Sequence, residues 1–190
     1  MLDRREVVGQ LLAERGDALV VSGLGSPTYD VAAVSPSPRN YYLWGAMGGA
    51  VMVGLGLALA QPLRHVIVIT GDGEALMGMG ALATVGAKQP GNLSIVVLDN
   101  EHYGETGMQQ SHLGMGVDLC GVAHSCGIAN ASAVKTAGEL ASALQSFHTT
   151  GAPKYLHVKV DPATPARVMP TRDAVENKLS FRAALRVAGD

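Results

Sequence analysis

Residues 65–74 read His65-Val66-Ile67-Val68-Ile69-Thr70-Gly71-Asp72-Gly73-Glu74, and this stretch sets the architecture of the chain. It begins as a short apolar run rich in β-branched residues, typical of a buried strand, and two glycines around an aspartate follow at once. A second apolar run, Leu93 to Leu98, is followed by Asn100 after one further residue. Because loops at the carboxyl ends of parallel strands share one sheet edge, we expect Asp72 and Asn100 to be neighbours.

Asp72 and Asn100 also carry the chemistry of this edge. Mg²⁺ prefers oxygen ligands, with one or two from side chains and the rest from phosphate and water. Glycines beside Asp72 let the backbone approach phosphate oxygens, and a helix starting near Glu74 would direct its positive end at the anion. The pattern indicates a magnesium diphosphate site. Gly-Asp-Gly alone is as often a turn or a helix N-cap, and both roles can coexist.

Composition narrows the class of protein. At 190 residues the chain is long enough for one domain with one core, and 47% hydrophobic content argues against disorder. A net charge of −2 with only 16% charged residues lacks the basic face that nucleic acid requires, so small molecules or other subunits are the expected partners. Cys120 and Cys126 follow no secretory leader, which favours free thiols and a cytoplasmic location.

The uncharged stretch from Leu43 to Ala60 is the one candidate for a membrane span. It barely reaches spanning length, glycines interrupt it, and Gln61-Pro62 ends it. A buried helix in an α/β core is therefore the favoured interpretation, and no membrane partner is expected.

Apolar patterning predicts strands that alternate with helices. Such alternation implies right-handed crossovers and a three-layer, doubly wound, mainly parallel α/β sheet with helices on both faces. The expected strands are Ala18–Ser22, Asn40–Leu43, His65–Thr70, Leu93–Leu98 and Tyr155–Val160, and the expected helices are Asp3–Arg15, Met47–Ala60, Glu74–Lys88, Asp118–Cys126 and Ala137–His148.

Three other ligand-binding motifs are excluded because this sequence lacks residues that they require. Gly23-Leu24-Gly25 could open a dinucleotide fingerprint, but Thr28 holds the third glycine position and Pro27 interrupts the turn. The segment from Gly71 to Gly78 lacks the Lys-Ser/Thr of a P-loop and the acidic alternation of a calcium loop. Nicotinamide, P-loop and calcium sites are therefore discarded.

Gly71-Asp72-Gly73 together with Asn100 resembles the signature of thiamine diphosphate enzymes. The similarity extends over nearly the whole chain to their diphosphate-binding (PP) domain, so residues 1–190 are expected to form one such domain. The finer resemblance is to the β subunits of sulfopyruvate decarboxylases and the matching half of phosphonopyruvate decarboxylases. The residues behind that finer likeness are Gly104–Gly107, Val117–Leu119 and the tail Pro170–Leu185.

The resemblance implies that the cofactors are thiamine diphosphate and Mg²⁺. It makes Asp72 and the Asn100 side chain magnesium ligands, with the His102 backbone carbonyl as a third protein oxygen. It places Gly45 with its carbonyl toward the aminopyrimidine and Met47 between the two cofactor rings, although ordinary helix packing explains a methionine as well. The full cofactor-binding set that it implies is Gly23, Leu24, Gly25, Ser26, Gly45, Met47, Gly71, Asp72, Gly73, Glu74, Asn100, His102, Tyr103 and Gly104.

Two further positions concern the substrate. His112 follows the cofactor loop, and this placement makes it a candidate catalytic proton donor or contact for a substrate carboxylate, although any of the six histidines could be a surface residue. Glu105 stands where the resembled subunits more often carry a small hydroxyl residue, which leaves the identity of the substrate open.

The function implied by the resemblance is that of a thiamine diphosphate-dependent 2-oxo acid decarboxylase subunit acting on a sulfopyruvate- or phosphonopyruvate-like substrate. The activating glutamate is expected on a separate pyrimidine-binding α subunit, in a hetero-oligomer such as α2β2. The alternatives are a carboligase or oxidoreductase subunit that uses the same cofactor, and a non-catalytic regulatory subunit of the same fold.

Overall fold

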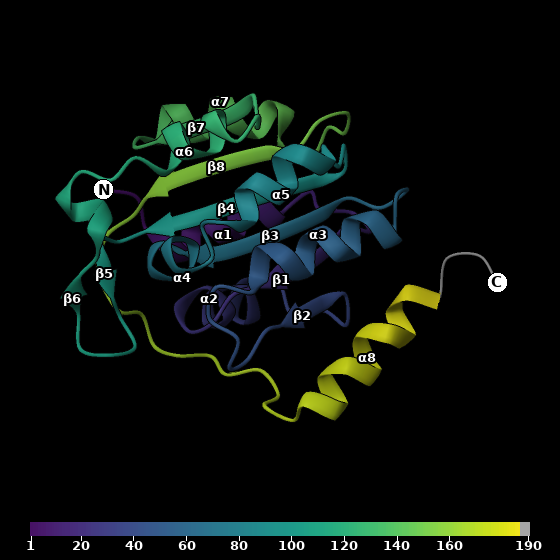
Figure 1. The fold of residues 1–190 in the computed structure, drawn as a ribbon. Helices are drawn as coiled ribbons and strands as arrows, with labels where there is room; N and C mark the ends of the chain where they lie inside the picture. The colour runs from purple at the N-terminus through teal and green to yellow at the C-terminus, as the bar shows by residue number, and fades with distance from the viewer. Residues whose placement is uncertain (187–190) are drawn as a thin grey trace.

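A six-stranded parallel sheet forms the centre of the molecule (Figure 1). The computed structural model describes residues 1–186, so the last four residues of the expected domain lie outside the described part. All neighbouring strands pair in parallel, in the order β2-β1-β3-β4-β8-β7. The strands are β1 (Leu19–Ser22), β2 (Asn40–Tyr42), β3 (Val66–Gly71), β4 (Leu93–Asp99), β7 (Asn130–Val134) and β8 (Lys154–Lys159). The predicted doubly wound α/β fold is confirmed.

Helices cover both faces of this sheet. Side chains alternate along each strand, so Val20 and Ile67 enter one core while Val21 and Val68 enter the other. The first core packs against α1 (Arg4–Leu12), α2 (Ser26–Val34) and α7 (Ala137–Phe147). The second packs against α3 (Ala50–Ala60), α5 (Ala81–Lys88), α6 (Leu119–Ser125) and α8 (Ala174–Arg186). Because these strands are buried on both faces, their sequences are nearly continuous apolar runs.

The helix predicted over Glu74–Lys88 is wrong as a single element. The structure has α4 (Asp72–Met77) and α5, separated by a turn at Gly78-Met79-Gly80. Gly78 is the C-cap of α4 and Gly80 is the N-cap of α5, and Gly78 also packs closely on the preceding loop, where a Cβ would lie only 2.2 Å from the carbonyl oxygen of Gly48. The helix predicted from Met47 also begins later, at Ala50, which leaves residues 45–49 as an irregular loop beside α4.

Helix α2, strand β7 and helix α8 were not anticipated. Pro27 lies in the first turn of α2, where its missing N–H costs nothing, so the residue that argued against a dinucleotide turn also starts a helix. Between β4 and α6 the chain forms a small hairpin of β5 (His102–Tyr103) and β6 (Gln109–Gln110), followed by the 3₁₀ helix η1 (His112–Met115).

Helix α3 occupies the stretch that was weighed as a membrane span. Gly54 in its middle packs directly on β3, since a Cβ there would lie 2.2 Å from the Cγ2 of Val68. None of the helices within residues 1–186 is long and apolar enough to cross a bilayer. Cys120 and Cys126 are free thiols in the described structure.

Candidate functional site

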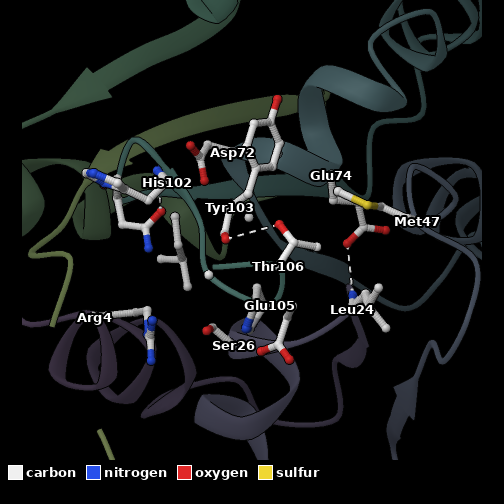
Figure 2. A pocket seen from close by; sticks show the side chains of 16 residues that line it. Arg4, Leu24, Ser26, Met47, Asp72, Glu74, His102, Tyr103, Glu105 and Thr106 are labelled. Atoms are coloured by element: carbon white, nitrogen blue, oxygen red, sulfur yellow. Dashed lines mark hydrogen bonds between the residues drawn. The ribbon is translucent and has the colours of Figure 1, made fainter. Parts of the chain in front are cut away.

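The candidate site lies at the point where the sheet changes direction. From β1 the chain moves to β2 on one side, whereas β3 lies on the other side, and ligands in such sheets bind beyond the carboxyl ends of the strands at this switch. Three loops meet there around a cavity of about 140 Å³ (Figure 2). The lining residues are Arg4, Leu24, Ser26, Pro27, Met47, Gly71, Asp72, Gly73, Glu74, Leu98, Asn100, His102, Tyr103, Gly104, Glu105 and Thr106.

Asp72 and Asn100 line the same cavity, as their positions after β3 and β4 predicted. The two strands pair directly, with Gly71 opposite Leu98. Most of the residues implied by the resemblance are in the lining as well. These are Leu24, Ser26, Met47, Gly71, Gly73, Glu74, His102, Tyr103 and Gly104.

Gly23, Gly25 and Gly45 are outside the lining. Gly23 lies behind it, where a Cβ would collide with the Glu74 carboxylate at 1.9 Å. Gly25 adopts a φ of 75° that favours glycine, and a Cβ there would press on the Glu105 side chain. Gly45 has a φ of 70° and sits on the exposed loop before α3, with nothing within 4 Å of a Cβ. The first two glycines shape the cavity wall, whereas Gly45 faces open space.

The Asp72 carboxylate is buried at the end of β3, with the residue only 3% exposed. Burial raises its pKa above the usual range of an aspartate, and the hydrogen bond from Ser111 acts in the opposite direction. Ser111 Oγ donates to Oδ2 at 2.5 Å. That bond engages one carboxylate oxygen and leaves the carboxylate with capacity for a cation.

Asn100 and His102 are held by a tight turn. The Asn100 Oδ1 accepts from the His102 N–H at 3.0 Å, and the Asn100 carbonyl accepts from His102 Nδ1 at 2.7 Å. Between them Glu101 has a φ of 60°, which is uncommon for a residue other than glycine. Two hydrogen bonds hold it in place, one from its N–H to Asp99 Oδ1 at 2.9 Å and one from the Ser111 N–H to its carbonyl at 2.7 Å. The loop therefore has a defined shape.

Asp99 anchors this turn from behind. Burial alone would raise the pKa of its carboxyl, but hydrogen bonds from His157 and the Glu101 N–H outweigh burial, and the pKa lies below its usual range. His157 Nε2 donates to Asp99 Oδ2 at 2.8 Å, and Lys159 Nζ lies 3.3 Å from the same oxygen. A charged aspartate thus supports the Asn100 loop from the far side of the cavity wall.

The oxygen donors fit a hard cation. Among the lining residues, Asp72 carries a carboxylate, Asn100 a side-chain amide and His102 a backbone carbonyl. Within residues 1–186 there is no group of three or more His, Cys, Asp or Glu side chains that could hold a metal ion. Such an incomplete set suits Mg²⁺, which keeps several water or phosphate oxygens.

Glu74 ties three segments together. Its Oε2 accepts from the Leu24 N–H and from Thr70 Oγ1, both at 2.9 Å, and its Oε1 accepts from the Ala50 N–H at 3.3 Å. The first of these bonds is drawn in Figure 2. The buried carboxylate therefore joins the β1 loop, the end of β3 and the start of α3. It supports the site and has little capacity left for a ligand.

Met47, Tyr103 and His112 occupy the open side. Met47 is 41% exposed, and its Cε approaches Gly73, where a Cβ would lie 3.6 Å away. The Tyr103 ring packs closely on Gly73 as well, 2.6 Å from the same Cβ position. His112 is outside the cavity lining and exposed, and its Nδ1 lies 3.3 Å from the Tyr103 hydroxyl.

Sequence reasoning missed several residues of the site. Arg4, Pro27, Leu98 and Thr106 line the cavity, and Ser111 contacts Asp72 behind it. Arg4 precedes the first strand and has no motif, so nothing in the local sequence could have pointed to it. Ser111 lies near the predicted cofactor loop, and its proximity to His112 was the only available signal.

A cavity beyond the carboxyl ends of parallel strands, at the switch point of the sheet, is where α/β domains commonly bind small ligands. Residues 23–158 match the family described as "Thiamine pyrophosphate enzyme, C-terminal TPP binding domain". The chain belongs to this family, and the resemblance inferred from Gly71-Asp72-Gly73 and Asn100 is confirmed.

Two relatives with named activities are similar in sequence to this chain. The chain is 40% identical over 162 residues to sulfopyruvate decarboxylase subunit beta of Methanothermobacter thermautotrophicus, covering 85% of this chain and 84% of the relative. It is 42% identical over 156 residues to phosphonopyruvate decarboxylase of Streptomyces viridochromogenes, covering 82% of this chain but only 39% of that longer protein.

A solved structure supports the fold alone. The thiamine diphosphate-dependent 4-hydroxybenzoylformate decarboxylase of Rhodococcus jostii superposes with a TM-score of 0.71 at 24% identity, over 84% of this chain and 33% of that one.

Proposed function

We propose that this chain is the diphosphate- and magnesium-binding subunit of a thiamine diphosphate-dependent decarboxylase for a sulfopyruvate- or phosphonopyruvate-like 2-oxo acid, built as one domain over residues 1–190. The observation that carries the proposal is the convergence of Asp72, Asn100 and His102 on one glycine-walled cavity at the switch point. The two decarboxylases described above support the substrate class. The free thiols of Cys120 and Cys126 favour a cytoplasmic location.

Each part of the cavity has a role in this proposal. Asp72, the Asn100 amide oxygen and the His102 carbonyl would hold Mg²⁺, which would supply positive charge for the diphosphate. Backbone N–H groups of Gly73, Glu74 and Gly104, which line the cavity, would donate to the phosphate oxygens. The loop of Gly23, Leu24, Gly25 and Ser26 closes the other side, while Gly45, Met47 and Tyr103 contact the rest of the cofactor at the open face.

The bound cofactor supplies an electron sink for the pair released when the bond to the substrate carboxylate breaks. His112 is the candidate on this chain for donating a proton or contacting the substrate carboxylate. Its exposed position beside Tyr103 is compatible with that role at a surface that a second subunit covers.

The activating glutamate is expected from another subunit. Among the lining carboxylates, Asp72 is engaged by Ser111 and Glu74 by three donors, while Glu105 lies at the rim, 3.5 Å from Arg167. A cavity of about 140 Å³ is also smaller than the roughly 300–1,000 Å³ of complete small-molecule sites. Both observations support half of a site, completed by a pyrimidine-binding α subunit in an assembly such as α2β2.

The apolar surface beside the open face supports the same assembly. Met47, Met52, Val53 and Leu59 on or before α3 and Met77 on α4 are all exposed in the described structure. Exposed apolar side chains in such a group are typical of surfaces that bind another protein. The relative named sulfopyruvate decarboxylase subunit beta is by its name one subunit of a larger enzyme.

Reconstitution tests the proposal. The chain should be purified with its partner from the native source and assayed for decarboxylation of sulfopyruvate and phosphonopyruvate with thiamine diphosphate and Mg²⁺. Asp72→Ala should abolish metal-dependent cofactor binding and turnover, whereas the surface control Asp17→Ala should retain both. Unchanged turnover in Asp72→Ala would remove the proposal. Products that form only with an added acceptor aldehyde or oxidant would favour a carboligase or oxidoreductase, and full cofactor binding without turnover would favour a regulatory subunit.

A further inference from the structure

Arg4 lines the cavity although it belongs to none of the loops that carry the family signature. It is the first residue of α1 and is only 5% exposed. We infer that Arg4 binds a phosphate oxygen of the cofactor's diphosphate, and that Asp30 orients its guanidinium for this contact. The inference rests on the proposed function, because it concerns the same cavity and the same anion.

The surroundings of Arg4 leave part of its guanidinium free for a ligand. Its Nε lies 2.5 Å from Asp30 Oδ2, on the fully buried carboxylate of α2. Arg5 Nε takes the other oxygen, Oδ1, at 3.1 Å, and Arg5 Nη2 donates to the Ala166 carbonyl at 2.8 Å. No hydrogen bond links an Nη nitrogen of Arg4 to any residue between 1 and 186. In the described structure the Arg4 Nε is buried without a hydrogen-bond partner, its contact with Asp30 being an ion pair, whereas the Nη nitrogens are not among the buried unpartnered atoms. The Nη pair is therefore the part of the guanidinium that a ligand in the cavity can reach.

The balance of charged residues in the cavity lining supports a role for Arg4 in binding an anion. Asp72, Glu74 and Glu105 contribute three carboxylates to the described wall, and Arg4 is the one lysine or arginine among the lining residues there. Two arginines share the single carboxylate of Asp30, so a positive charge remains uncompensated at this end. Glu105 already has Arg167 beside it, so a diphosphate near Asp72 and Glu74 requires other compensating cations, and Arg4 is the lining arginine that can act together with Mg²⁺.

The position of Arg4 fits the phosphate end of the cofactor. In Figure 2 it lies near Ser26, across the cavity from Met47, which the proposed function places beside the cofactor rings. Arginine presents several N–H donors in a planar fork that matches phosphate oxygens, whereas lysine acts as a point charge. The contact should therefore depend on the guanidinium and not on charge alone.

Calorimetric titration of the 190-residue chain, alone and in complex with its partner, with thiamine diphosphate and Mg²⁺ tests the inference. Arg4→Gln should weaken the apparent Kd at least tenfold, and Arg4→Lys should fall between Arg4→Gln and the natural chain. Arg5→Gln is the matched control, because Arg5 also contacts Asp30 but does not line the cavity, and its Kd should stay within about twofold. Affinity should also depend less on salt in Arg4→Gln than in the natural chain, since one charge-assisted contact is gone.

The outcomes separate the two proposals. Equal Kd values for Arg4→Gln and Arg5→Gln, or an unchanged salt dependence, would show that Arg4 serves only to neutralise Asp30, and the inference would fail while the proposed function stands. If the natural chain binds no cofactor either alone or with its partner, both the proposed function and the inference about Arg4 fail. Should Arg4→Gln not fold, Arg4→Lys decides the question, because a Kd equal to that of the natural chain would overturn the need for a guanidinium.

Discussion

Ser111 Oγ donates a 2.5 Å hydrogen bond to Asp72 Oδ2, and this bond links two segments that are far apart in the chain. Asp72 follows β3, whereas Ser111 follows the β5-β6 hairpin and is fully buried. The Ser111 N–H also donates to the Glu101 carbonyl at 2.7 Å. One serine therefore fixes both the carboxylate and the turn that carries Asn100, which makes the geometry of the proposed metal site depend on it.

Ser111→Ala should weaken magnesium-dependent cofactor binding about tenfold, the lower end of the effect of residues that orient metal ligands. The fold should persist with a loss of about 1 kcal/mol, the net value of one hydrogen bond. Calorimetric titration measures the first effect and urea denaturation the second. Ser142→Ala, which removes a hydroxyl bonded to the Gly138 carbonyl on α7, should leave affinity unchanged. Equal affinities in both variants would contradict the role assigned to Ser111.

Asp72→Asn should stabilise the cofactor-free chain at neutral pH while abolishing Mg²⁺ binding. Burial raises the pKa of Asp72 in the folded chain, so the folded state holds this proton more tightly than the unfolded state does. Its contribution to stability is therefore favourable at low pH and is lost as pH rises through the folded pKa. Thermal unfolding of both chains across a pH series should show that loss only in the natural chain. A lower Tm for Asp72→Asn at pH 7 would contradict the argument.

The same shift predicts the pH dependence of metal binding. Protons compete with Mg²⁺ for the Asp72 carboxylate, so affinity should begin to fall at a higher pH than for an ordinary exposed aspartate. Titrations of the natural chain with Mg²⁺ and cofactor over a descending pH series measure the midpoint. Ser111→Ala should move this midpoint upward, because the hydrogen bond from Ser111 lowers the pKa of Asp72.

Gly54→Ala and Gly56→Ala should change stability in opposite directions although both lie in α3. A Cβ on Gly54 would lie 2.2 Å from Val68 Cγ2, so overpacking should cost roughly 1–3 kcal/mol. Gly56 has nothing within 4 Å of a Cβ, so alanine there should gain up to about 1 kcal/mol of helix propensity. Urea midpoints compare the two, and stabilisation by Gly54→Ala would show that α3 is free to move away from β3.

Glu74→Gln should loosen the β1 loop. An amide cannot accept on both of its terminal atoms, so one of the donors now bound, among them the Leu24 and Ala50 N–H groups, loses its partner. A loss of roughly 1–3 kcal/mol is expected for a buried donor left unsatisfied. Hydrogen exchange should accelerate at residues 23–25 and at the start of α3. Glu14→Gln on the surface is the control, and unchanged exchange in Glu74→Gln would contradict the anchoring role.

The sequence by itself determined the parallel sheet and the meeting of Asp72 with Asn100. Both follow from local information, since apolar runs mark buried strands, and the ends of neighbouring parallel strands share one edge. The glycines and the family signature added the kind of ligand.

Only the tertiary structure decided which other groups reach that edge. Arg4, Ser111 and the break at Gly78 depend on packing between segments remote in sequence: α1 against α2, the hairpin against β3, and the loop before α3 against α4. Sequence patterns report what a residue and its near neighbours prefer, whereas these contacts arise from how completed elements approach one another in space. For that reason the oxygen ligands could be predicted from the chain, but the residues that orient and neutralise them could not.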